Sequence, residues 1–136
     1  MYSKEINYKD YNGIQRTEKF YFNLSRVEVL ELEAATPGGL KQFLENMAET
    51  KDNHKLIEFI KELIRLSYGV KSPDGKYFRK SEEIWEEFRY SEAFVELFLS
   101  LGEDSRAASE FVNGIIPQEI LNTETPENAA KLTLME

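Results

Sequence analysis

The chain has 136 residues, of which 41% are hydrophobic and 12% aromatic, a composition that suits one folded domain with a hydrophobic core. It contains no cysteine, a single histidine and no apolar run near the ~20 residues of a membrane helix, which excludes disulfides, Cys- or His-rich metal centres and membrane spans. Its 17 Lys and Arg residues against 25 Asp and Glu residues give a net charge of −8, which argues against nucleic acid and anionic membranes as partners and leaves protein partners or mimicry of nucleic acid.

Residues 3–22 are predicted to form a β-hairpin, because an Asn-Gly pair at residues 12–13 lies between two runs rich in Tyr, Ile, Thr and Phe. A two-residue loop would place Lys9 opposite Arg16, and such a like-charge pair is unfavourable. A three-residue loop, with Gly13 in the left-handed region, avoids this pair. It aligns Glu5 with Lys19 and Asn7 with Thr17, and it gathers Ile6, Tyr8, Ile14 and Phe20 on one face. We therefore predict the three-residue loop.

Two helices are predicted next. Ser25 and Glu28 have the spacing of a capping box, which starts a helix that ends near Ala35. Thr36 as N-cap and Pro37 as first helical residue predict a second helix. Its apolar stripe is Leu40, Phe43, Leu44, Met47 and Ala48. Gly38-Gly39 in its first turn indicates that another element or a partner approaches the backbone closely.

The longest helix is predicted to start at Asp52 or Asn53 and to run to Tyr68, where Gly69 stops it. Its buried stripe is Leu56, Ile60, Leu63 and Ile64. Residues 70–80 are predicted to be a loop with a turn at residues 72–75, anchored to the core by Tyr77 and Phe78. The basic residues of this loop surround the two rings as in a minimal nucleic-acid platform, but ordinary loop charges are the preferred interpretation.

Three more helices complete the prediction. Ser81 caps a short helix with Trp85 on its inner side, and its early carboxylates (Glu82, Glu83, Glu86 and Glu87) favour a solvated acidic face over a cation site. Ser91 caps a helix that Gly102 ends and that is apolar almost all round, so it is either central in the core or covered by a second chain. The last helix covers residues 104–113, with Gly114 at its end and Pro117 beyond.

These elements predict a mainly α fold with an N-terminal β-hairpin, a small single-domain helical bundle of the α+β type. The domain is expected to cover residues 1–121, and residues 122–136 are expected to be a mobile tail. No spacing assembles a catalytic, cofactor or metal site, and His54 is expected on the surface among Asp52, Asn53 and Lys55. The sequence therefore indicates a protein that binds protein and is not an enzyme.

Three stretches resemble the tail assembly chaperones of long-tailed bacteriophages. The first is the hairpin followed by Thr36-Pro37-Gly38-Gly39-Leu40. The second begins at Tyr68-Gly69, passes through Lys71-Ser72, Asp74-Gly75, Phe78 and Lys80-Ser81, and continues into Ser91, Ala93, Leu97 and Phe98. The third is Phe111, Asn113-Gly114-Ile115 and Pro117. In order and spacing these stretches cover residues 3 to about 121.

The resemblance implies a non-enzymatic chaperone in the cytoplasm of the bacterial host, absent from the mature virion. Such chaperones bind the long, largely helical tape measure protein, keep it soluble and help to bring tail tube subunits to it. In many phages a translational frameshift adds an extension that contacts the tube protein, and this chain would correspond to the shorter form. The alternative from the residues themselves is an acidic protein-binding inhibitor that mimics DNA.

A client with apolar helical stripes needs a complementary apolar surface on the chaperone. Phe94, Phe98 and Leu101 share one face of the apolar helix at i, i+4 and i+7, and this face is the predicted binding surface, alone or through self-association. Tyr77 and Phe78 are the other candidate partner-binding residues. The net charge of −8 would keep many copies soluble on one client.

Overall fold

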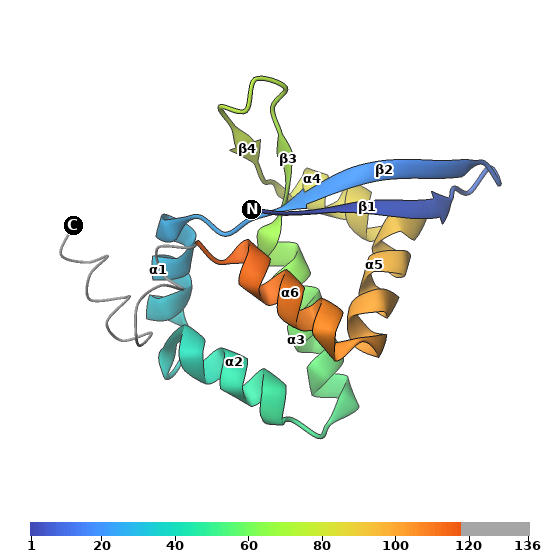
Figure 1. Ribbon diagram of the computed structural model, residues 1–136. Helices are drawn as coiled ribbons and strands as arrows, with labels where there is room; N and C mark the ends of the chain where they lie inside the picture. Colours follow the sequence, from blue (N-terminus) through green and yellow to red (C-terminus); the bar gives the residue numbers. More distant parts are fainter. Residues whose placement is uncertain (118–136) are drawn as a thin grey trace.

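The computed structural model describes residues 1–117 and arranges them as six helices and four strands (Figure 1). A small antiparallel sheet lies on one side of the helices, in the order β1-β2-β3-β4. The predicted mainly helical domain with an N-terminal hairpin is thus confirmed in outline, although the sheet is larger than the hairpin alone. The predicted domain end at residue 121 and the tail from residue 122 lie outside the described residues.

Strands β1 (Tyr2–Lys9) and β2 (Gln15–Phe22) form the N-terminal hairpin in the predicted register. Glu5 pairs with Lys19 and Asn7 with Thr17. The three-residue loop is confirmed as well: the N–H of Asp10 donates to the carbonyl of Ile14 at 2.9 Å, and Gly13 has a φ of 80°. The Asp10 carboxylate accepts from the backbone N–H groups of Asn12 and Ile14 at 2.9 Å and from Arg16 Nε at 2.6 Å. These hydrogen bonds lower the pKa of Asp10 from its usual value, and the bond from Arg16 has the largest effect.

The inner face of the hairpin is buried only at its base. Ile6 is buried and Tyr8 and Phe20 are half-buried, whereas Ile14 is 54% exposed. The hairpin extends past the helices, so its tip has nothing beneath it (Figure 1).

Strands β3 (Tyr68–Lys71) and β4 (Phe78–Arg79) form a second hairpin. The prediction of a loop over residues 70–80 is therefore wrong, although the turn at residues 72–75 is present, with the Gly75 N–H bonded to the Ser72 carbonyl at 2.9 Å. Strand β3 forms because Phe22 and Tyr21 of β2 pair with its first two residues. Residues far apart in the chain make this pairing, so the local pattern does not contain it.

Helix α1 (Arg26–Ala35) has the predicted capping box between Ser25 and Glu28. Helix α2 (Gly39–Glu49) begins later than predicted, because Thr36 caps the end of α1 and the chain turns through Gly38 and Gly39. Both glycines have left-handed φ angles of about 80°. A Cβ on Gly39 would also collide with the Glu33 carboxylate of α1. Gly38 is thus the N-cap of α2 and Gly39 its first residue, so the helix begins two residues after the predicted Pro37, and the element that closely approaches the Gly39 backbone is α1 through Glu33.

Helix α3 (Asn53–Ser67) is capped by Asp52, α4 (Glu82–Arg89) by Ser81 and α5 (Glu92–Glu103) by Ser91. Helix α3 therefore ends one residue before the predicted Tyr68, which is its C-cap, and Gly69 belongs to β3. Helix α5 continues through Gly102, so the predicted end at that glycine is slightly early. Helix α6 (Ser105–Ile115) contains Gly114, which was expected beyond its end. A Cβ on Gly114 would lie 2.9 Å from the Cβ of Tyr2, so this glycine allows β1 to pack on α6.

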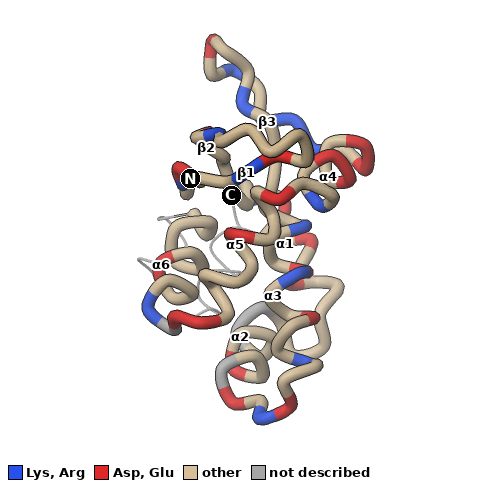
Figure 2. Tube along the Cα trace, turned by 90° about the vertical axis from the view of Figure 1, so that its right-hand side faces the viewer, with Lys and Arg blue, Asp and Glu red and all other residues tan. Residues whose placement is uncertain are grey.

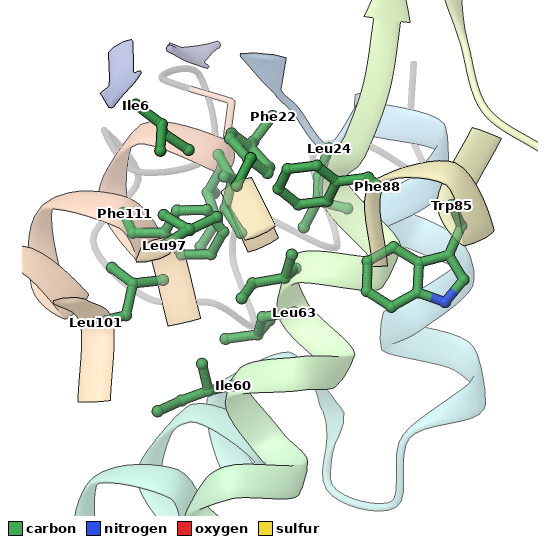
Figure 3. Close-up of a cluster of buried hydrophobic side chains, with 14 of the residues drawn as sticks. Ile6, Phe22, Leu24, Ile60, Leu63, Trp85, Phe88, Leu97, Leu101 and Phe111 are labelled. Atoms are coloured by element: carbon green, nitrogen blue, oxygen red, sulfur yellow. The ribbon is translucent and has the colours of Figure 1, made fainter. Parts of the chain in front are cut away.

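The hydrophobic core lies between the inner face of the hairpin and helices α3, α4, α5 and α6 (Figure 3). Phe22 is at its centre, with its ring 5.5 Å from that of Phe111 and 5.9 Å from that of Phe88. Tyr68 stacks on Phe88 at 4.2 Å. Burial there, followed by the charges of Glu87 and Glu18, raises the pKa of the Tyr68 hydroxyl to about 12.

Lys80 links three parts of the fold below the sheet. Its Nζ donates to the carbonyl oxygens of Asn23 and Leu66 at 2.6 and 2.7 Å and to the Glu28 carboxylate at 2.6 Å. Burial lowers the pKa of Lys80, and its bond to Glu28 opposes this change. The sequence pattern assigns Lys80 to a basic loop, whereas the structure uses it to attach α1 to the end of α3.

Candidate protein-binding groove

Most titratable side chains of residues 1–117 are exposed, with Tyr2, Tyr68 and Lys80 among the partly buried exceptions. No group of three or more His, Asp and Glu residues in this part of the chain could hold a metal ion. His54 is exposed and lies 3.6 Å from the Glu58 carboxylate one helical turn away on α3. Acidic residues gather on α4, basic residues predominate on the second hairpin, and elsewhere basic and acidic positions are interspersed (Figure 2). No helix in the described part of the chain is long and apolar enough to cross a membrane.

An apolar groove lies between α2 on one side and α6 on the other. Its volume is about 620 Å³. We name it the α2–α6 groove; its apolar lining is Leu44, Met47, Leu56, Ile60, Leu101, Ala108 and Val112. The amphipathic pattern of α2 explains why it exists: the helix turns its apolar stripe toward α6, whereas its main packing contacts are with α1 and α3. As a result, none of the described apolar side chains of α2 is buried.

The residues at the floor of the groove are buried in the core, whereas those of its wall on α2 are only half-buried. Ile60 of α3 and Leu101 of α5 are 8% and 3% exposed, so the core holds both of them. Leu44 and Met47 on α2 are half-buried and reach the core only at its edge. Thr50, Ser109 and Asn113 provide hydrogen-bonding groups among the lining residues. An apolar centre with a few polar groups at its margin is typical of a surface that takes an amphipathic helix.

The five predicted partner-binding residues lie at separate places. Leu101 lines the α2–α6 groove. Phe94 and Phe98 are half-buried and stack on one another at 5.8 Å, and the Phe94 ring also packs on Trp85 at 5.7 Å. Tyr77 is 60% exposed beside the turn of the second hairpin, so it does not anchor that segment. Phe78 is half-buried and its ring covers Gly69.

Helix α5 is chiefly a core helix. Ala93, Leu97 and Leu101 are buried, and Val95 and Leu99 are 37% and 48% exposed on the outer side. Sequence reasoning selected Leu101 as a partner-binding residue but missed the other apolar groove residues (Leu44, Met47, Leu56, Ile60, Ala108 and Val112). The sequence signal for the first two is the apolar stripe of α2, which indicates a buried face but not the element that covers it.

A family model described as phage tail assembly chaperone matches residues 1–134. No curated protein and no solved structure matches the chain.

Proposed function

The chain belongs to a family of phage tail assembly chaperones, and from this premise we propose that it binds the tape measure protein of its phage in the host cytoplasm. The bound chaperone keeps the tape measure protein soluble and helps to recruit tail tube subunits, itself or through a longer frameshifted form. It acts by binding alone, without a catalytic step, and it is released before the virion is complete.

The α2–α6 groove is the observation that carries this proposal. A tape measure protein exposes apolar stripes along a largely helical chain, and an amphipathic helix binds by laying such a stripe in a complementary groove. The groove has an apolar floor at Ile60 and Leu101 and an apolar wall at Leu44 and Met47. An amphipathic client helix would therefore complete the burial that α2 lacks within residues 1–117. The face of α5 around Phe94 supports binding less well, because its rings already pack on one another and on α4.

Co-expression with the tape measure protein of the same genome tests the proposal. We expect the tape measure protein to be soluble only with the chaperone and to co-purify with it. The double variant Leu44→Glu and Met47→Glu should reduce recovery of the complex roughly tenfold, because it places charges in the contact surface.

The matched control is Val95→Glu with Leu99→Glu, which makes the same chemical change on the exposed side of α5. Thermal unfolding of each variant alone should show that both remain folded. If the control reduces recovery and the groove variant does not, the client binds α5. If the tape measure protein is equally soluble with and without the chain and never co-purifies, the proposed function is wrong.

A further inference from the structure

A second opening lies on the opposite side of α3, and its net charge is opposite in sign to that of the whole chain. It has a volume of about 720 Å³ and lies between α2, α3 and α4. We name it the α3–α4 cleft. Aromatic residues (Phe43, Phe59 and Trp85) line it, and its rim is charged. Phe43 and Phe59 meet edge to face at 4.9 Å, which joins α2 to α3 at one end of the cleft.

The rim of the cleft is positive in a chain that is strongly negative. Four lining residues (Lys55, Lys61, Arg65 and Arg89) are basic and two (Glu58 and Glu62) are acidic, which leaves a local charge of +2 against −8 for the whole chain. A docking surface steers and selects partners whose charge is opposite to its own. The positive rim therefore favours an acidic partner.

Three of the basic groups remain available to a partner. Arg65 forms an ion pair with Glu62, which raises its pKa. By contrast, neither Lys55 nor Lys61 makes a side-chain hydrogen bond or ion pair with other residues that the structure describes. Arg89 lies over the ring of Tyr90 at 5.3 Å, a contact that leaves its N–H groups free for a carboxylate.

The length of the cleft along α3 indicates the length of the segment that fits. The cleft residues on α3 run from Lys55 to Arg65, ten positions apart, which corresponds to about 15 Å along a helix. An extended chain covers this distance with about five residues. We propose that the α3–α4 cleft binds a short acidic segment of a partner protein, with one aromatic or large aliphatic side chain on the aromatic floor and carboxylates toward Lys55, Lys61 and Arg89. This site is additional to the α2–α6 groove and does not require that the groove binds the tape measure protein.

The single tryptophan of the chain provides the test, because Trp85 lines the cleft. An acetylated and amidated EDFDE peptide, which contains no tryptophan, is titrated into the full chain while Trp85 fluorescence is followed. We expect saturable binding at low ionic strength that weakens with added salt, and no binding of a KKFKK peptide. Failure of EDFDE to bind would overturn the proposal.

Charge reversal then locates the site. The variant K61E/R89E should bind EDFDE at least about tenfold more weakly than the wild type. The variant K9E/K76E makes the same change in net charge at exposed positions outside the cleft and should bind normally. Circular dichroism checks that both variants fold. Equal affinities of the two variants would overturn the proposal.

Two further outcomes would assign the cleft to a different occupant and overturn the proposal. If sedimentation shows a wild-type dimer that K61E/R89E dissociates, the occupant is a second copy of the chain. If E124K/E127K raises the affinity for EDFDE, the occupant is the chain's own C-terminal segment. Neither result bears on co-purification of the tape measure protein through the α2–α6 groove, so the two proposals fail separately.

Discussion

At the scale of single residues, Lys80 shows how one side chain can hold three elements together. Its ammonium group contacts the β2–α1 junction, the end of α3 and Glu28. Lys80→Met keeps much of the aliphatic side chain but leaves a carboxylate and two carbonyl groups without their donor. We expect this change to lower the free energy of unfolding by about 2 kcal/mol, measured by urea denaturation. Lys76→Met, at an exposed position, is the control and should have little effect. Equal stability of the two variants would show that the Lys80 contacts contribute nothing net.

At the scale of elements, the turn between α1 and α2 depends on the backbone of two glycines. Gly39 has a φ of 79°, and a Cβ there meets Glu33. Gly39→Ala should therefore destabilise the protein by about 1–3 kcal/mol. Gly102 of α5 has open space around its Cβ position, so Gly102→Ala should stabilise by up to about 1 kcal/mol through helix propensity. Thermal unfolding of the two variants measures whether Gly39→Ala lowers and Gly102→Ala raises the stability. A neutral Gly39→Ala would mean that the turn tolerates a side chain and that Glu33 simply moves away.

The same scale shows what the sequence can and cannot predict. The hairpin register follows from charges and apolar residues within twenty positions, and helix starts follow from caps such as Ser25 and Ser81. Strand β3 could not be predicted, because its pairing partner Phe22 is distant in the chain. For the candidate site, too, the sequence predicts the local features but not the contacts between distant elements. The periodicity that selects Leu101 and Met47 as apolar-face residues is local, but the groove between them is formed by four separate helices.

At the scale of the whole molecule, stability should be unevenly distributed. The sheet, α5 and α6 share the buried core around Phe22 and Phe111, whereas the described apolar side chains of α2 are only half-buried. Helices that bury little apolar surface open at lower free energy than the global unfolding reaction. Amide hydrogen exchange followed by mass spectrometry should therefore show faster exchange in residues 39–49 than in residues 92–103. The tape measure protein should slow exchange in α2 and change α5 little, because a client helix in the α2–α6 groove supplies the missing contacts. Exchange in α2 as slow as in α5 without a client would show that the groove wall is already fully supported, and protection confined to α5 would place the client on the other face.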